Sequence, residues 1–174
     1  MPTILWIVGE PGLGKTTAAR QFVEKESYLV EAPKWTCGPF VALAGHYRNH
    51  TFDGADRVPY NGVQDCLHFW EARLSNHALT IYDGDRFSNQ NVRTWYSTNY
   101  PAVRQRCVLF AAPPEIGQQR RTARNTDQNQ SWVKGRITKS RRFFETFEEG
   151  DRVEICAQQN PDAVLGAIRS WLDA

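Results

Sequence analysis

Hydrophobic and polar positions follow two different rhythms along this chain. Short apolar runs, which are typical of buried strands, alternate with longer segments in which apolar residues recur every three or four positions, as on one face of a helix. The apolar runs lie at residues 4–8, 40–44, 78–82, 107–111 and 153–156, with a short additional strand at 28–30. The helical segments lie at residues 17–25, 62–74, 89–100, 114–124, 132–147 and 160–172.

Strands and helices therefore alternate from one end of the sequence to the other. This order predicts an α/β fold in which helices cover both faces of a mainly parallel sheet, joined by right-handed crossovers. We expect a three-layer αβα sandwich with about five strands. A chain of 174 residues is long enough for one well-packed domain and short for two, so we expect a single domain over residues 1–174.

The most specific motif lies between the first strand and the first helix. Residues 9–16 read Gly-Glu-Pro-Gly-Leu-Gly-Lys-Thr, a complete phosphate-binding loop (P-loop) in the strand–loop–helix context that the motif requires. Its glycines let backbone N–H groups converge at a helix N-terminus, Lys15 adds charge for the β- and γ-phosphates, and Thr16 offers a hydroxyl to Mg²⁺. The predicted nucleotide-binding residues are Gly9, Glu10, Pro11, Gly12, Leu13, Gly14, Lys15, Thr16 and Thr17.

This motif predicts a P-loop NTPase fold that binds ATP and Mg²⁺. It does not by itself distinguish a kinase from an ATPase or a GTPase. A glycine-rich turn without a ligand is the alternative interpretation.

The charge is ordinary overall but unevenly distributed. The net charge is +2, yet residues 118–142 hold eight basic residues and a single acid, Asp127. We expect residues 120–139 to form an arginine-rich lid whose cations, Arg121, Arg124 and Arg136, clamp the phosphates from both sides of a loop. The alternatives are a solvated helix face or a nucleic-acid surface.

The remaining bulk features exclude a membrane protein. No apolar run approaches the roughly 20 residues that a membrane-spanning helix needs, and the first strand begins too close to Met1 to leave room for a targeting segment. The four cysteines are widely separated, which favours free thiols in a reducing compartment. We therefore expect a cytoplasmic protein without a membrane partner.

A P-loop enzyme needs an acid at the end of a neighbouring strand to manage Mg²⁺. Asp83 and Asp85 follow the apolar run at 78–82, at the sheet edge where ligands bind in such folds. We expect Thr16, Asp83 and Asp85 to serve the metal, with Asp85 favoured for metal or base and Asp83 as a supporting group. Arg86 is a candidate for holding a substrate or transferred phosphate. A simple Asp-Gly turn is the alternative for the acids.

The segment at residues 47–61 is the candidate acceptor-binding loop. It is polar and long, and it carries two carboxylates that could accept a hydrogen bond or a proton, next to aromatic residues that could stack on a base. The predicted substrate residues are Phe52, Asp53, Asp56, Arg57 and Tyr60, with Asp53 also a catalytic candidate. Trp132, in the lid, is a further candidate for stacking. A polar surface loop without function is the alternative.

Several of these segments resemble a known family. The P-loop, the Asp85-Arg86-Phe87-Ser88 segment after a strand and the arginine-rich lid resemble thymidylate kinase and its P-loop kinase relatives. The segments 45–48, 51–56, 83–86 and 130–139 are more closely similar to small kinases of bacteriophages and actinobacteria. Some phage members phosphorylate 5-hydroxymethyluracil in DNA, a step in thymidine hypermodification that evades host restriction.

This resemblance implies a role for each matching residue. Lys15 and Thr16 would grip ATP-Mg, Asp85 would serve the metal or act as the base, and Arg121, Arg124 and Arg136 would clamp phosphates. The Asp53–Asp56 loop would meet the substrate hydroxymethyl group. The chain departs from thymidylate kinase after its second strand, where residues 31–34 lack an Asp-Arg pair, which argues against free thymidine monophosphate.

Three functional hypotheses remain open from the sequence. The first is a kinase that acts on the hydroxymethyl group of 5-hydroxymethyluracil in phage DNA, within the host cytoplasm. The second is a kinase for a free nucleoside, a nucleoside monophosphate or another small hydroxyl metabolite. The third is a non-kinase NTPase binding module. The sequence leaves the acceptor and the oligomeric state open.

Overall fold

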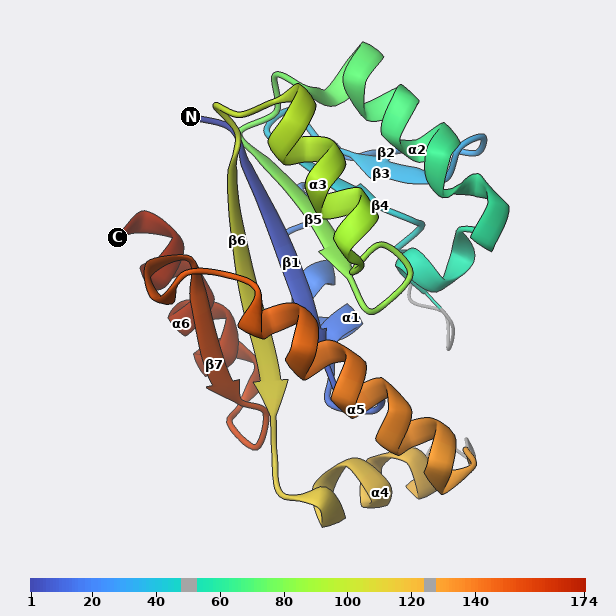
Figure 1. Ribbon diagram of the computed structural model, residues 1–174, viewed down its shortest axis with the longest axis vertical. Helices are drawn as coiled ribbons and strands as arrows, with labels where there is room; N and C mark the ends of the chain where they lie inside the picture. Colours follow the sequence, from blue (N-terminus) through green and yellow to red (C-terminus); the bar gives the residue numbers. More distant parts are fainter. Residues whose placement is uncertain (48–52, 124–127) are drawn as a thin grey trace.

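The computed structural model describes residues 1–47, 53–123 and 128–174. One seven-stranded sheet runs through the described parts of the chain in the order β2-β3-β4-β5-β1-β6-β7 (Figure 1). The strands are β1 (Thr3–Gly9), β2 (Tyr28–Val30), β3 (Trp35–Cys37), β4 (Val41–Ala44), β5 (Leu79–Asp83), β6 (Arg104–Ala111) and β7 (Arg152–Cys156). The helices are α1 (Lys15–Arg20), α2 (Val63–Phe69), α3 (Gln90–Asn99), α4 (Pro114–Ala123), α5 (Gln130–Glu145) and α6 (Pro161–Asp173).

The central part of the sheet is parallel. β1 pairs in parallel with β5 on one side and with β6 on the other, while β4 pairs in parallel with β5 and β7 with β6. The chain thus extends the sheet in both directions from β1, which makes the carboxyl end of β1 the point where the strand order reverses. Ligands bind at such points in open α/β sheets, and the P-loop leaves β1 there.

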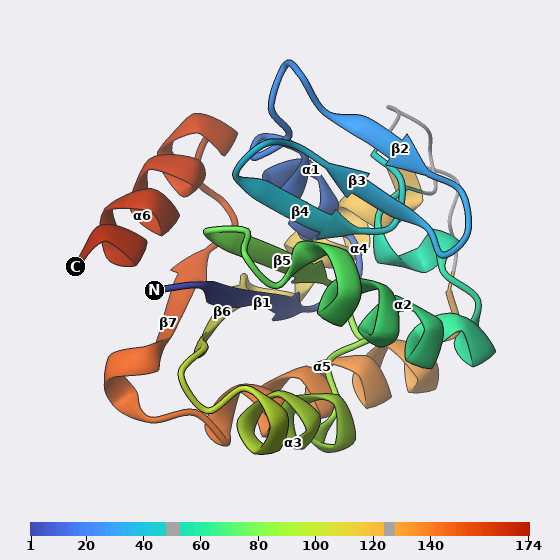
Figure 2. The same ribbon diagram turned by 90° about the horizontal axis from the view of Figure 1, so that it is seen from above.

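Helices cover both faces of the sheet, as the alternating pattern predicts. α1 and α6 lie on one face, and α2, α3 and α5 on the other (Figure 2). Successive side chains of β1 point to opposite faces of the sheet. Trp6 packs in the core cluster with residues of α2, α3 and α5, whereas Ile7 packs in the cluster with residues of α1 and α6. Because β1 is covered on both faces, it reads as a continuous apolar run. The predicted three-layer α/β fold is confirmed.

The number of strands is a correction to the prediction. The sheet has seven strands rather than about five, because the short antiparallel strands β2 and β3 extend it beyond β4. β3 spans only Trp35–Cys37 and follows a turn, so no alternation is long enough to reveal it. α1 is also shorter than the expected helix at 17–25, and the α2 helix continues as a π-helical turn over Trp70–Leu74.

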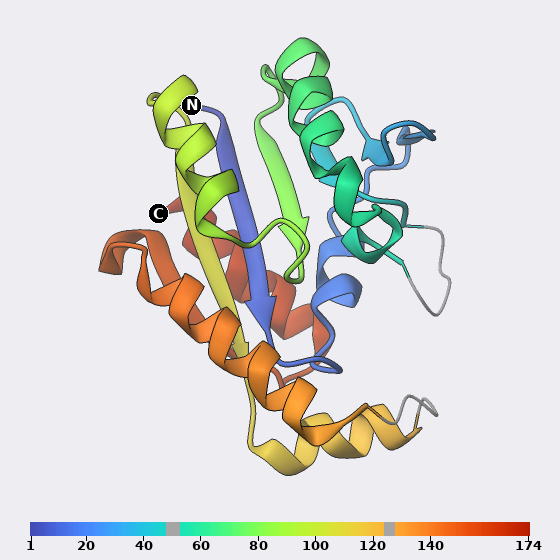
Figure 3. The same cartoon turned by 45° about the vertical axis from the view of Figure 1, so that its right-hand side comes forward.

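α4 and α5 contain most of the segment that the sequence predicts to be a lid. α4 lies beyond the carboxyl end of β6, and α5 returns from there along the sheet (Figure 3). The inner side of α5 is anchored by buried residues, among them Val133 and Phe143. No helix in the described ranges is both long enough and apolar enough to cross a membrane.

Candidate active site

The P-loop holds its lysine inside the loop. Gly14 adopts a left-handed conformation (φ +88°) that turns the chain into α1, which begins at Lys15. The Lys15 ammonium donates hydrogen bonds to the carbonyl oxygens of Gly9 (2.9 Å) and Glu10 (2.8 Å). Burial lowers the pKa of Lys15 to about 8, against the opposing attraction of Asp83, Asp56 and Glu10. The lysine therefore loses its charge at a lower pH than an exposed lysine does.

Asp83 is the acid that the structure brings to the P-loop. It is the last residue of β5, the strand paired with β1, and it is buried. Its Oδ2 accepts a hydrogen bond from the Thr16 hydroxyl (2.6 Å), and its Oδ1 accepts from the Tyr47 hydroxyl (2.7 Å) and the Ala55 amide (2.9 Å). Three donors around this one buried carboxylate fix its orientation. Thr16 and Asp83 thus form one polar unit at the carboxyl edge of the sheet.

Gly54 lets the residues of the predicted acceptor loop that the structure describes pass close to Asp83. The Gly54 amide donates to the carbonyl oxygen of His46 (2.7 Å), and Gly54 takes a positive φ of +77°. A Cβ at Gly54 would lie 2.8 Å from both oxygens of the Asp83 carboxylate. A glycine is therefore required here for residues 53–56 to pass over Asp83, with Asp53 and Asp56 on either side of the crossing.

Asp53 and Asp56 have different surroundings. Asp53 is buried and its Oδ2 pairs with the Arg20 guanidinium of α1 at 2.8 Å. Asp56 is open to solvent, lines the P-loop cavity, and makes no hydrogen bond or ion pair with any of the residues that the structure describes. Desolvation and the charge of Asp83 raise the pKa of Asp56, while Arg86, Lys15 and Arg136 oppose that rise. Asp53 ties the loop to α1, whereas Asp56 presents its carboxylate to the cavity.

Arginines from two elements face the same cavity. Arg86, which follows β5, stacks on the Tyr60 ring with its guanidinium carbon 3.6 Å from the ring centre. Arg136 of α5 forms an ion pair with Asp85 and lies over Trp132 at 4.7 Å. The neighbouring guanidinium groups of Arg136 and Arg86 lower the pKa of Tyr60. The lid helix therefore closes one side of the cavity with cations and aromatic rings.

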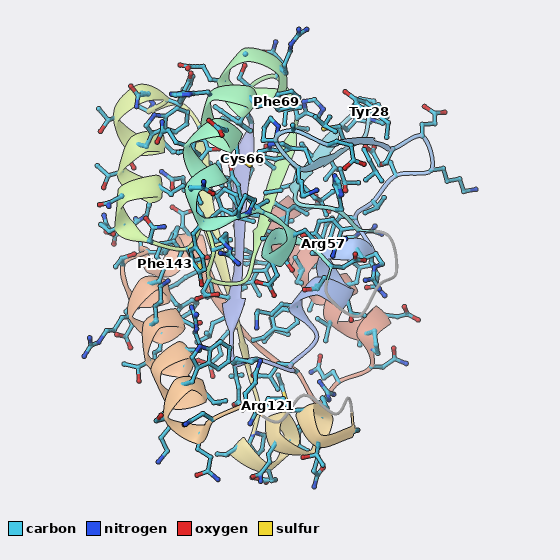
Figure 4. All side chains as sticks on the ribbon, turned by 90° about the vertical axis from the view of Figure 1, so that its right-hand side faces the viewer. Tyr28, Arg57, Cys66, Phe69, Arg121 and Phe143 are labelled. Carbon is cyan, nitrogen blue, oxygen red and sulfur yellow. The ribbon has the colours of Figure 1, made fainter. Side chains whose placement is uncertain are left out.

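Two further contacts link the lid to its surroundings. Lys139 lies 3.6 Å from the carboxylate of Asp85, so this acid faces two cations of α5. Arg121 of α4, at the P-loop end of the molecule (Figure 4), donates to the Glu10 carboxylate (2.6 Å) and to the carbonyl oxygen of Pro11 (2.8 Å). Arg121 thus binds the P-loop itself as well as lining the cavity.

Most of the predicted residues share one cavity of about 630 Å³. It is lined by Gly9, Pro11, Gly12, Gly14, Lys15, Thr16, Thr17, Arg20, Asp53, Asp56, Tyr60, Asp83, Gly84, Asp85, Arg86, Arg121, Gln128, Trp132, Arg136 and Ser140. The set joins the P-loop, the end of β5, the acceptor loop and the lid. These four segments are far apart in sequence, and their convergence is what the combined motifs predict.

A few predicted residues lie elsewhere. The side chain of Leu13 is buried in the core cluster beside α1 and α6, and Arg57 is exposed and outside this cavity. The Glu10 side chain points to Arg121 rather than into the cavity. Phe52 and Arg124 fall outside the described residues.

Sequence reasoning missed two residues that organise the site. Tyr47 ends the segment after β4 and reaches Asp83, and Arg20 ends α1 and holds Asp53. Each contact joins residues more than 30 positions apart. The only signal was the polar end of an otherwise apolar strand, Gly45-His46-Tyr47, which does not reveal a partner.

The site fits a nucleoside triphosphate with Mg²⁺. The P-loop amides and Lys15 suit its phosphates, and the Thr16 hydroxyl with the adjoining Asp83 carboxylate suits the metal. No group of three or more His, Cys, Asp or Glu residues within the described ranges could bind a metal by itself. This small donor set matches Mg²⁺, which is usually held by one or two protein groups together with phosphates and waters.

Comparisons with known proteins agree with this architecture. No curated protein gave a match. Among solved structures, the chain is similar to a sugar kinase from Janibacter sp. HTCC2649, with a TM-score of 0.58, 17% identity, and coverage of 99% of this chain and 95% of that one. It is also similar to deoxyadenosine kinase from M. mycoides with bound dATP, with a TM-score of 0.54, 10% identity, and coverage of 98% and 99%.

These two similarities establish a shared fold, the α/β fold of P-loop kinases. The family comparison is more specific, because a model described as an AAA domain (AAA_33) matches residues 4–146. That match extends from β1 through the P-loop, Asp83 and the lid helix α5, and it covers most of the chain. The protein therefore belongs to the AAA_33 family of AAA domains.

Proposed function

We propose that this protein is an ATP-dependent kinase that transfers the γ-phosphoryl group to a hydroxyl of a small acceptor. One observation carries the proposal. A single cavity joins the P-loop, the Thr16–Asp83 pair, the Asp56 carboxylate, which pairs with none of the described residues, and the arginines Arg86 and Arg136, all from one chain. Phosphoryl transfer needs a binding site for the triphosphate donor, a base and arginines that neutralise phosphate charge. A switch or motor that relies on an arginine from a partner fits this arrangement less well.

The donor half of the site follows from the P-loop. Lys15 and the loop amides would hold the triphosphate, and Thr16 with Asp83 would hold Mg²⁺, which neutralises phosphate charge when bound. Asp83 is the better candidate than Asp85 on the metal side, because it is bonded to the Thr16 hydroxyl. Asp85 is paired with Arg136 and Lys139 of α5. We therefore assign Asp85 to positioning the lid cations.

Asp56 is the best candidate for the base. It lines the cavity, is unpaired among the described residues, and has a raised pKa, which makes its carboxylate a better proton acceptor. In the proposed step the acceptor oxygen forms a bond to the γ-phosphorus, its proton goes to Asp56, and the bond to the β-phosphate oxygen breaks, releasing ADP. Arg86 and Arg136 would stabilise the charge on the transferred group.

We rank a free small acceptor above a base in DNA. The solved structures with the same fold include a sugar kinase and a deoxyadenosine kinase, whose substrates are small molecules. A nucleoside, a nucleoside monophosphate or another small hydroxyl metabolite therefore leads the list. The hydroxymethyl group of 5-hydroxymethyluracil in DNA is supported by the sequence resemblance and by the exposed basic residues of α5, such as Lys134 and Arg142.

A transfer assay with matched lysine variants tests the proposal. Purified protein, labelled ATP and Mg²⁺ are mixed with a panel of nucleosides, nucleoside monophosphates, sugars and hydroxymethylated DNA. We expect transfer to an acceptor, reduced by at least about 10²-fold in Lys15→Ala. Lys25→Ala is the control, because Lys25 is an exposed lysine that lies outside the cavity and outside α5. Full transfer by Lys15→Ala, or ATP hydrolysis that is equally fast without any acceptor, would refute the kinase assignment.

Salt dependence separates the two kinds of acceptor. A polymer gripped through several phosphates loses apparent affinity steeply as salt rises, because counterions compete for the protein cations. A small acceptor held by one or two contacts gives a nearly flat response. The same panel measured at about 50 and 200 mM salt therefore decides between them.

A further inference from the structure

A second cavity adjoins the first on the side away from the P-loop. It has a volume of about 410 Å³ and lies between α2 with the turn before it and α3 with the loop before it. Tyr60 and Arg86 line both cavities and therefore mark the boundary between them. A volume in the range of roughly 300–1,000 Å³ is typical of small-molecule sites. An acceptor in this cavity would thus face the phosphate-binding cavity across Arg86.

One wall of this second cavity is apolar and firmly supported. Leu67 and Val92 are almost fully buried beneath it, and the partly exposed ring of Trp95 forms its side. Trp95 is held edge-on by Trp70, with ring centres 6.2 Å apart, and contacts Tyr100 at 5.3 Å. Because the indole is fixed from behind, its cavity side is a preformed flat surface for an apolar ring.

The rim of the second cavity is built of neutral carboxamides. They belong to Asn61, Gln64, Asn89 and Asn91. Asn89 uses its Oδ1 to cap α3 through the Val92 amide (3.1 Å), which fixes its orientation. The side chains of Asn61 and Asn91 make no hydrogen bond to any described residue, and both are exposed at the rim. A carboxamide offers both donors and an acceptor, so this rim suits a ligand edge that also carries both.

Charge distinguishes this cavity from the phosphate-binding one. Of the described residues that line it, Arg86 alone is ionic at neutral pH, and its guanidinium lies on Tyr60 at the boundary. A carboxylate or phosphate ester inside the cavity would have to be desolvated with carboxamides as its main partners, and burying an unpaired charge is costly. The lining therefore favours an uncharged ligand.

We propose that this second cavity is the acceptor site and takes an uncharged ring with an apolar face and hydrogen-bonding edges, as a nucleobase has. The inference rests on the proposed kinase function. The ring would lie against Trp95, its polar edge would meet Asn61 and Asn91, and its hydroxyl-bearing end would reach Arg86 and Asp56. A sugar alone would leave the apolar wall uncovered, and a nucleoside monophosphate would bring a dianion. The ring can come from a free nucleoside or from a base displaced from a strand.

The test combines an acceptor panel with two carboxamide variants. The panel holds uncharged nucleosides, their 5′-monophosphates, neutral sugars and an oligodeoxynucleotide with 5-hydroxymethyluracil. Asn61→Ala and Asn91→Ala remove exposed side chains that make no hydrogen bond to the described residues, so folding should be preserved. We expect the double variant to raise the KM for the ring-bearing acceptor about tenfold or more and to leave the KM for ATP unchanged. Thr98→Ala, an exposed change on α3 outside the cavity, should alter neither constant.

Each outcome decides the inference. Transfer to a free nucleoside, or only to the oligonucleotide base, supports the ring site and identifies its source. Transfer to monophosphates or sugars alone, or an acceptor KM that is unchanged in the double variant, overturns the ring site and leaves the kinase function standing. Calorimetry with a nucleoside separates the two proposals further. Nucleoside binding that is lost in the double variant, without transfer to any acceptor, would retain the ring site and remove the kinase function.

Discussion

Replacing Tyr47 with phenylalanine isolates the hydrogen bond that holds Asp83 from outside the P-loop. The Tyr47 ring is 7% exposed, and its hydroxyl lies 2.7 Å from Asp83 Oδ1. Phenylalanine keeps the ring and its packing but removes this donor. Asp83 then retains the Thr16 hydroxyl and the Ala55 amide as donors. The substitution therefore perturbs one buried, charged hydrogen bond and little else.

The size of the effect follows from the nature of the acceptor. A hydrogen bond to a charged group contributes about 1.5–3 kcal/mol to stability. In a domain of about this size, 1 kcal/mol shifts the melting temperature by roughly 2–4 °C. We therefore expect Tyr47→Phe to lower the melting temperature by roughly 3–12 °C.

Urea denaturation measures this loss directly. The midpoint should fall while the slope of the unfolding free energy against urea stays constant, because the surface exposed on unfolding is unchanged. Tyr28→Phe is the matched control, since Tyr28 is 59% exposed and its change should stay within about 0.5 kcal/mol. A loss below that limit in Tyr47→Phe would refute the argument that Tyr47 stabilises the Asp83 carboxylate.

Three other predictions concern residues around the same cavity. Because the pKa of Lys15 is lowered to about 8, its charge is lost as the pH rises through that value. Nucleotide titrations should therefore show weaker triphosphate binding at pH 9 than at pH 7, and equal affinity would contradict the role of Lys15 in phosphate binding. Asp56→Asn should lower kcat by about 10²–10⁴-fold, because it removes the proposed base. In the parent protein the rate should rise with pH as Asp56 loses its proton. If the variant keeps this rise in its pH–rate profile, Asp56 is not the base. Gly54→Ala should lower the unfolding free energy by about 1–3 kcal/mol, because φ is +77° and the new Cβ would meet the Asp83 carboxylate. The control is Gly135→Ala in α5, where the space around the glycine is open, and denaturation should show no loss of stability.

The fold was predictable because its central strands are buried on both faces. β1 and β5 read as continuous apolar runs in the sequence, and the helices between the strands show one apolar face. The short strand β3, which lies between β2 and β4, could not be predicted in this way, because three residues give no period and its antiparallel pairing with these two strands is set by tertiary contacts. β3 is buried throughout, so burial alone did not make a strand predictable, whereas the edge strands β2 and β7 were predicted from their apolar residues.

The donor half of the site was predictable for a different reason. The P-loop is contiguous, so its spacing alone implies converging amides and a lysine. Which of the two acids lies beside the P-loop threonine was not predictable. The sequence favoured Asp85, whereas in the structure Asp83 accepts the hydrogen bond from Thr16. The direction in which each carboxylate points depends on the pleat of β5 and on a tyrosine 36 positions away. The catalytic roles of both acids remain predictions.

The proposed acceptor site, the second cavity, shows why an acceptor is harder to predict from the sequence than a phosphate site. Its walls come from residues 60–67 and 86–95, two segments that are separated by the whole of β5. Each segment contributes ordinary helix-surface asparagines and glutamine together with core residues, and none of these forms a motif. They come together only because α2 and α3 lie on the same face of the sheet and leave Trp95 partly exposed between them. A phosphate-binding site can be recognised from eight consecutive residues, because it binds through their backbone amides. The proposed ring site would bind through side chains from separate segments, which only the fold brings together.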